Sequence, residues 1–194
     1  AEPGTIVVIN GVAGAGKSSI VRELQLQSPR PYLNAGIDTF LRMLPGRWLE
    51  GDEWLDVMGR HDRPGVTGRR LVSGMHAAVA ALARAGNDVA VDHVLVEPAW
   101  IGECATLFAP LPAWFIGVVA PLDELEQRER ERPDRQATLG EAARQFHVVH
   151  AQAAYDLELD TSALSAAECA QRIRDRIAGS PPRAFTLFAL FEHA

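Results

Sequence analysis

Eight consecutive residues near the start of the sequence have the types and spacing of a phosphate-binding loop. They read Gly-Val-Ala-Gly-Ala-Gly-Lys-Ser and fit the pattern G-x-x-x-x-G-K-[ST] at every fixed position. Glycines let the backbone curl so that its N–H groups point at phosphate oxygens, and a following helix adds its positive end. We therefore predict phosphate binding by Gly11, Val12, Ala13, Gly14, Ala15, Gly16, Lys17, Ser18 and Ser19.

The two polar side chains that end this loop have separate expected roles. Lys17 can reach the β- and γ-phosphates of ATP, and the Ser18 hydroxyl can coordinate the accompanying Mg²⁺. Residues 5–9 are rich in Val and Ile and predict a buried strand, and residues 17–27 have helical apolar spacing. This strand–loop–helix context favours a phosphate loop over a glycine-rich turn with a chance lysine.

Asp38 is the candidate catalytic base. It follows residues 32–35, a predicted second strand, so we expect it beyond the carboxyl end of the sheet, where ligands of parallel sheets bind. A carboxylate there can accept the proton of an attacking hydroxyl or orient it. The alternative is that Asp38 caps the helix predicted for residues 38–44. A capping carboxylate has its oxygens engaged, so the two roles compete, and the local sequence leaves both open.

Arg132 and Arg135 are the candidate phosphate-binding arginines. Pro133 ends a predicted helix, and the capping-box spacing of Thr138 and Glu141 predicts that the next helix runs to about residue 150. The arginines would then lie on a short connection, which we predict to be a lid over residues 128–138 that closes on ATP.

Such a lid would place positive charge on the transferring phosphoryl group and exclude water. The alternative is a solvated charge run, and we expect Arg128 and Arg130 to be surface residues of that kind. The predicted catalytic residues are therefore Asp38, Lys17, Arg132 and Arg135.

Asp92 ends the apolar run 89–91 within a strand predicted for residues 88–94. A carboxylate at that position lies near the metal or the substrate, so Ser18 and Asp92 are the predicted Mg²⁺ ligands. We assign no role to His93. His147 and His150 are three residues apart on a predicted helix, but no third ligand is evident, so we expect no metal site there.

Strands that alternate with helices predict an α/β fold, in which a parallel sheet is flanked by helices on both faces. We treat residues 1–194 as a single domain, with an irregular excursion over 42–65 that is rich in Gly, Arg, Asp and Trp and for which we expect one helical turn. The apolar tail over 180–194 either packs on the body or contacts a partner. Further strands are predicted over 113–120 and 155–160, and helices over 66–85, 98–108, 121–131 and 165–178.

The composition limits the partners. The net charge is −6 and the isoelectric point is about 5.5, which argues against a nucleic-acid binder. Three prolines interrupt the most apolar stretch, 107–122, so we expect no membrane helix. We see no signal peptide, and Cys104 and Cys169 have no CxxC partner, so we expect a reducing, cytoplasmic location.

A phosphate loop alone does not separate kinases from switches and motors. The sequence has no guanine-reading N-K-x-D box and is short for a motor ATPase. Asp38 and the arginine segment favour a kinase whose partner is a small molecule with a hydroxyl group. A nucleotide or nucleic-acid 5′-hydroxyl kinase and a non-catalytic ATP-binding switch remain alternatives, and the sequence leaves open whether the chain forms a homo-oligomer.

These features together resemble the chloramphenicol phosphotransferase-like proteins, a branch of the P-loop kinases. Besides the loop, the resemblance includes Asp38 in Gly-Ile-Asp, the strand that ends at Asp92, and the segment over 155–161. The resemblance implies ATP-dependent phosphorylation of the primary hydroxyl of chloramphenicol, which would inactivate the antibiotic. It also implies that Asp38 acts as the base and that Arg132 and Arg135 belong to the lid.

The sequence departs from this family pattern in three places. Residues 41–65 do not follow it, although the resemblance implies that this region shapes the acceptor pocket. His93 replaces an acidic residue, and the tail after residue 179 is additional. The reaction class is therefore a firmer expectation than the substrate.

Overall fold

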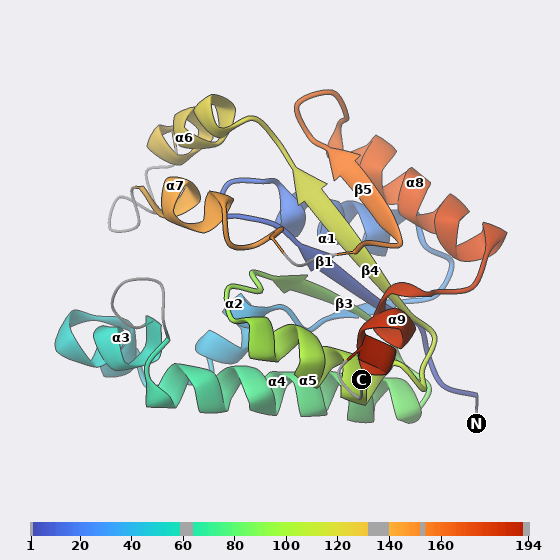
Figure 1. Cartoon of the computed structure of the whole chain (residues 1–194), viewed down its shortest axis with the longest axis horizontal. Helices are drawn as coiled ribbons and strands as arrows, with labels where there is room; N and C mark the ends of the chain where they lie inside the picture. Colours follow the sequence, from blue (N-terminus) through green and yellow to red (C-terminus); the bar gives the residue numbers. More distant parts are fainter. Residues whose placement is uncertain (1, 59–63, 132–139, 152–153, 192–194) are drawn as a thin grey trace.

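The fold is organised around one sheet of five parallel strands. The structure is a computed structural model and describes residues 2–58, 64–131, 140–151 and 154–191. The strand order is β2-β3-β1-β4-β5, with β1 in the centre (Figure 1). This confirms the predicted α/β fold. The strands are β1 (Ile6–Asn10), β2 (Tyr32–Asn34), β3 (Asp88–His93), β4 (Ala113–Val119) and β5 (Leu157–Asp160).

Helices cover both faces of this sheet. None of the described helices is long and apolar enough to cross a lipid bilayer. The helices are α1 (Lys17–Gln27), α2 (Ile37–Leu41), the 3-10 helix η1 (Gly46–Leu49), α3 (Gly51–Met58), α4 (Val66–Arg84), α5 (Pro98–Phe108), α6 (Leu122–Arg130), α7 (Glu141–Phe146), α8 (Ala166–Gly179) and α9 (Ala184–Phe191).

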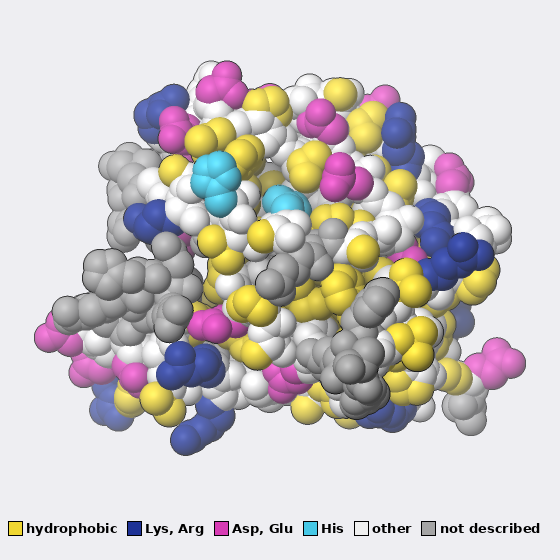
Figure 2. Space-filling model, viewed as in Figure 1, with side chains coloured by type: hydrophobic (Ala, Val, Ile, Leu, Met, Phe, Trp, Pro, Cys, Tyr) yellow, Lys and Arg dark blue, Asp and Glu magenta, His cyan; other side chains and the backbone are white. Residues whose placement is uncertain are grey.

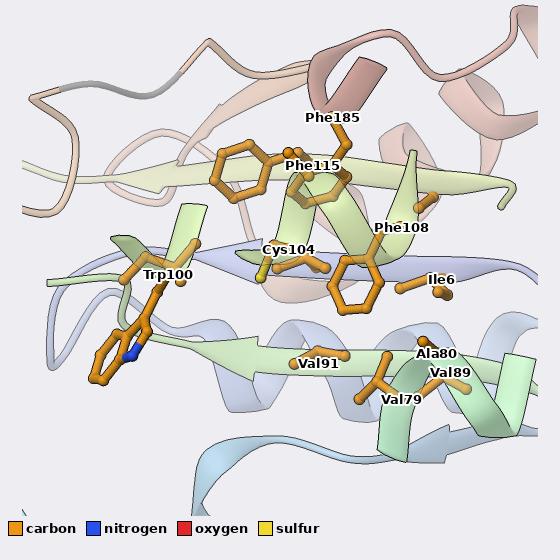
Figure 3. Close-up of a cluster of buried hydrophobic side chains, with 14 of the residues drawn as sticks. Ile6, Val79, Ala80, Val89, Val91, Trp100, Cys104, Phe108, Phe115 and Phe185 are labelled. Atoms are coloured by element: carbon orange, nitrogen blue, oxygen red, sulfur yellow. The ribbon is translucent and has the colours of Figure 1, made fainter. Parts of the chain in front are cut away.

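Strand β1 is buried along its whole length and supplies both cores. Side chains alternate across a strand, so Ile6 and Val8 pack with α4, α5 and α9, whereas Val7 and Ile9 pack with α1 and α8. Figure 3 shows the first core, in which Phe108 and Phe185 approach Ile6 and Phe115. A central strand buried on both faces fixes the position of the loop that follows it.

The apolar tail packs on the body. Helix α9 lies against β4 and α5, and the buried Phe185 ring is 4.9 Å from the Phe115 ring and 5.5 Å from the Phe108 ring. Asp156 supports this packing because its Oδ1 accepts the N–H of Arg183 at 2.8 Å. Of the two alternatives predicted for the tail, the structure therefore shows packing on the body of the domain.

Two predicted segments differ in the structure. The excursion predicted to be irregular contains η1 and α3, because Asp52 and Glu53 favour the first turn of α3, which then packs on α4. The helix predicted to run to about residue 150 ends at Phe146, where a turn closes with Val148 N–H and Val149 N–H bonded to the Gln145 carbonyl. Thr138, its predicted cap, lies outside the described residues, and Gly140 occupies the capping position.

Candidate active site

The phosphate loop joins the carboxyl end of β1 to α1. Its first residue, Gly11, passes so close to β4 that an added Cβ would lie 2.5 Å from the Val118 carbonyl oxygen. Gly14 and Gly16 have φ angles of 81° and 89°, in the left-handed region that favours glycine. The three glycines thus meet two backbone requirements, a close approach at Gly11 and a positive φ at Gly14 and Gly16.

The N-terminus of α1 opens towards this loop. Gly16 occupies the capping position, so no side chain covers the first N–H groups of the helix. A helix N-terminus together with inward N–H groups is an anion-binding arrangement. The loop therefore has the backbone needed for phosphate binding.

Lys17, Ser18 and Asp92 lie together at the carboxyl ends of β1 and β3. The Ser18 hydroxyl donates a hydrogen bond to Asp92 Oδ2, and Lys17 Nζ is 3.8 Å from Asp92 Oδ1. Lys17 Nζ also donates to the Val12 carbonyl oxygen at 2.8 Å. The lysine side chain is 7% exposed and that of Asp92 is 17% exposed, so water screens this pair only weakly.

Asp38 is carried to the same edge of the sheet. Gly36 packs so tightly on β3 that an added Cβ would lie 2.9 Å from the Asp92 Cβ, and Asp38 follows in the first turn of α2. Gly36 occupies the capping position of that helix, so Asp38 is not its N-cap residue. The structure therefore removes the simple N-cap alternative, and it places Asp38 two residues after the contact between Gly36 and Asp92.

Arg132 and Arg135 lie outside the described residues, as does most of the predicted lid. Arg130 is an exposed residue paired with Glu126, as predicted. The prediction for Arg128 was wrong. Its guanidinium donates to the Thr161 hydroxyl at 3.0 Å and to the Thr161 carbonyl at 2.8 Å, and it approaches the Gly14 carbonyl at 3.5 Å.

Thr161 links Arg128 to the phosphate loop. Its hydroxyl donates to the Ala15 carbonyl at 3.0 Å, and its methyl group would be 3.8 Å from a Cβ added at Gly16. The end of β5 and the end of α6 therefore support the loop from outside. The alternating charges around Arg128 hid this contact because they match the pattern of a solvated helix face.

Asn10, immediately before the loop, is also held by side chains that the sequence did not single out. Its Nδ2 donates to the Tyr155 hydroxyl at 2.9 Å and to the Val149 carbonyl at 3.1 Å, and its Oδ1 accepts the Leu95 N–H at 2.9 Å. The Tyr155 hydroxyl bonds to His150 Nδ1 at 2.7 Å. His150 thus has a structural partner, and burial lowers its pKa.

His93, next to Asp92, begins a buried chain of hydrogen bonds. Val94 N–H donates to His93 Nδ1 at 2.8 Å, so the proton of the neutral ring is on Nε2, which donates to His76 Nε2 at 2.8 Å. His76 Nδ1 then donates to Glu103 Oε2 at 3.0 Å. These bonds fix one tautomer for each ring.

Burial favours the neutral form of both rings. Burial lowers the pKa of His76, although the Glu103 carboxylate opposes this. Burial, His76 and Lys17 lower the pKa of His93 well below its usual value. A proton added to either ring would place two N–H groups face to face, so the chain is intact only when both rings are neutral.

Among the described residues, no three His, Cys, Asp or Glu side chains lie close enough together to hold a metal ion by themselves. A hollow of about 400 Å³ lies between α2 and α4, lined by Phe40, Leu44, Thr67, Arg70, Leu71 and Gly74. Phe40 is two residues from Asp38 and therefore on a different side of α2. We do not assign this hollow to the acceptor.

Two solved structures that share this fold are kinases. The Mycobacterium tuberculosis APS kinase CysC, in complex with AMPPNP and APS, aligns with a TM-score of 0.66 and 19% identity, over 92% of this chain and 100% of that one. A gluconokinase from Sinorhizobium meliloti aligns with a TM-score of 0.59 and 18% identity, over 98% and 96%. With the glycine loop at the end of β1, these likenesses define a P-loop kinase fold.

The chain belongs to the chloramphenicol phosphotransferase-like family, whose model matches residues 4–178. It is similar to a Mycobacterium tuberculosis H37Rv protein named "Putative O-phosphotransferase Rv2636", with 27% identity over 94% of this chain and 86% of that protein. The resemblance predicted from the sequence is confirmed, and the chain is a kinase of the O-phosphotransferase kind.

Proposed function

We propose that the protein transfers the γ-phosphoryl group of ATP, with Mg²⁺, to the primary hydroxyl of chloramphenicol or a related antibiotic and so inactivates it. The observation that carries the proposal is the meeting of Lys17, Ser18 and Asp92 behind a complete phosphate loop. Family membership adds the alcohol acceptor and chloramphenicol as the first substrate to test.

The residues present fit a nucleotide and its metal. The curled loop and the uncapped start of α1 suit phosphate oxygens, and Lys17 supplies a positive charge. Mg²⁺ prefers oxygen ligands and usually keeps several waters, so one hydroxyl and one carboxylate suffice when the nucleotide supplies others. Ser18 and Asp92 would be those two protein ligands.

When bound, ATP with Mg²⁺ supplies an activated phosphoryl group. Asp38 would orient the acceptor hydroxyl and accept its proton as the hydroxyl oxygen bonds to the γ-phosphorus and the bond between that phosphorus and ADP breaks. Lys17 stays near the phosphates and offsets charge that develops on them. Arg132 and Arg135 are proposed to add positive charge from the lid, and removal of Arg135 should slow transfer by about 10³-fold.

A nucleotide or nucleic-acid 5′-hydroxyl kinase would share most of these residues. On the face drawn in Figure 2, acidic and basic side chains are interspersed among the residues that it colours. Nucleic-acid binders usually present a continuous basic surface, so this arrangement and the net charge of −6 favour a small acceptor. A switch that binds ATP without transfer has no observation in its favour.

The test is mass spectrometry of small-molecule products after incubation with ATP and Mg²⁺. The panel holds chloramphenicol, other hydroxylated antibiotics, nucleosides and a 5′-hydroxyl oligonucleotide. We expect one added phosphoryl group on chloramphenicol, and none with Lys17→Ala. Transfer to another acceptor instead would overturn the substrate but keep the reaction class. Nucleotide binding without any transfer would favour the switch.

A further inference from the structure

One peptide unit of the phosphate loop is bonded on both sides. The Val12 carbonyl oxygen accepts a hydrogen bond from Lys17 Nζ at 2.8 Å, and the N–H of Ala13, in the same unit, donates to Gln145 Oε1 at 2.8 Å. In a trans peptide the C=O and the N–H point in opposite directions. Lys17 and Gln145 therefore bind this unit from opposite sides.

Gln145 is well placed to orient that unit. It is 9% exposed, and because a backbone N–H can only donate, the atom that faces Ala13 must be the carboxamide oxygen. A peptide whose N–H is bonded becomes a stronger acceptor at its C=O, so the bond to Gln145 also strengthens the bond to Lys17. Without Gln145 the unit could rotate and turn its carbonyl away from the lysine.

The helix that carries Gln145 is itself fixed. Glu129, at the end of α6 and 5% exposed, accepts the N–H of Gly140 at 2.9 Å and those of Glu141 and Ala142 at 3.1 Å. A negative charge at the start of a helix is stabilising, and here it also closes three N–H groups that would otherwise lack partners. Figure 1 shows α7 beside the loop that leaves β1. The position of Gln145 is thus set from outside the loop.

We propose that Gln145 is a positioning residue for Lys17. It holds the Val12–Ala13 peptide unit, and that unit sets where the lysine amine lies. The inference rests on the proposed function only in its assignment of Lys17 to the phosphates. Gln145 touches neither the acceptor nor the reacting atoms in this account, and its effect should be confined to nucleotide binding and to the lysine.

The environment of the Lys17 amine can be measured directly, because Lys17 is the only lysine in the sequence. Isotope-labelled lysine therefore gives one side-chain NMR signal, which reports on this amine without any catalysis. Gln145→Met keeps the length of the side chain and removes the acceptor oxygen. We expect this change to shift the Lys17 signal and to speed hydrogen exchange of the Ala13 amide. Gln145→Glu keeps an acceptor oxygen, so the Ala13 amide should stay protected from hydrogen exchange in that variant.

Gln25→Met is the matched control. Gln25 also uses its carboxamide to bind a backbone group, the Tyr32 carbonyl at 2.7 Å, but away from the loop. We expect Gln145→Met to weaken ADP binding about tenfold, and Gln25→Met to leave both ADP affinity and the Lys17 signal unchanged.

An unmoved Lys17 signal in Gln145→Met, or an equal shift in Gln25→Met, would overturn the proposal. If the wild-type protein bound no ADP, the proposed function would fail, and the Lys17 and Ala13 signals would still decide the role of Gln145.

Discussion

Helix α1 buries Lys17, Ile20, Val21 and Leu24, whereas α2, which lies on the other side of Asp92, buries none of its side chains. The next helix, η1, buries none either, and Val57 is the buried residue among the described side chains of α3. The phosphate side of the candidate site is therefore part of the core. The side that carries Asp38 is less deeply buried, because every residue of α2 is half-buried and only Ile37 and Phe40 of this helix pack on the core.

This difference in burial predicts which side of the candidate site tolerates substitution. Buried, close-packed side chains constrain one another, so substitutions on the phosphate side disturb many contacts. Exposed segments tolerate substitution, and binding specificity commonly resides in such segments on a rigid scaffold. Two kinases below 20% identity share this fold.

The largest effect is expected from Asp38→Asn, which changes only the side of the candidate site that carries Asp38. General-base catalysis typically contributes 10²–10⁴-fold, so we expect kcat to fall by about that factor. ATP affinity, measured by calorimetry, should stay within about twofold of wild type, because Asp38 is not expected to touch the phosphates. An unchanged kcat would remove Asp38 from the mechanism, and a parallel loss of ATP affinity would contradict the separation of the two sides.

Lys17→Met tests the buried side. It should slow transfer by about 10²–10³-fold, the usual effect of removing one preorganised donor from a developing charge, and it should also weaken ATP binding. Steady-state kinetics and calorimetry on the same preparation measure both effects. Full ATP affinity in this variant would show that the loop binds phosphate without the lysine.

Gly36→Ala tests the contact between the two sides. Its Cβ would lie 2.9 Å from the Asp92 Cβ, so either α2 or β3 must shift, and we expect a loss of about 1–3 kcal/mol in the free energy of unfolding together with a lower kcat. Gly74→Ala is the control, since nothing lies within 4 Å of its Cβ and alanine favours a helix. Equal stability losses in urea unfolding would contradict this account.

The buried histidine chain predicts a dependence of stability on pH. Folding lowers the pKa of His76 and of His93 below the ordinary value of 6.5, so the unfolded chain takes up protons first as the pH falls. Stability should therefore be complete above pH 6.5 and decline as the pH falls from there towards the lowered pKa values. Thermal unfolding at several pH values measures this decline, and His76→Asn should make it shallower. If stability declined equally steeply with falling pH in His76→Asn and in the wild type, the His76 ring would not contribute to this dependence.

The smallest effect is expected from Met43→Ser. Met43 is 66% exposed within the segment that we propose shapes the acceptor site, so the change should alter KM for the acceptor by about two- to fivefold and leave stability within about 0.5 kcal/mol. Leu26→Ser changes a residue on α1 that is 79% exposed, and it should alter neither KM for the acceptor nor KM for ATP. A change in KM for ATP with Met43→Ser would contradict the proposed division.

Much of the nucleotide half could be predicted because local patterns determine it. The glycine pattern, the apolar strand before it and the helical spacing after it predicted β1, the loop and α1. The helix predicted over 165–178 corresponds to α8, and its start is fixed by a capping box between Ser165 and Glu168, of which both bonds are present. In each case the residues that interact are neighbours in the sequence.

The supporting contacts could not be predicted because they join distant residues. Ala13 and Gln145 are 132 residues apart, and no sequence pattern links Gln145 to the phosphate loop. Arg128 matched the pattern of a surface helix, and the tertiary contact with Thr161 overrode it. The hydrogen-bond chain from His93 joins β3 to His76 on α4 and to Glu103 on α5. No pattern in the sequence predicts that these three residues meet.

The packing of α9 has a consequence for where the folding unit ends. The family match stops at residue 178, yet the helix that buries Phe185 begins at Ala184. A chain shortened to the family boundary would expose the faces of Phe108 and Phe115, and would leave the Asp156 carboxylate without the Arg183 N–H. The family match and the packed core therefore end at different residues of the same chain.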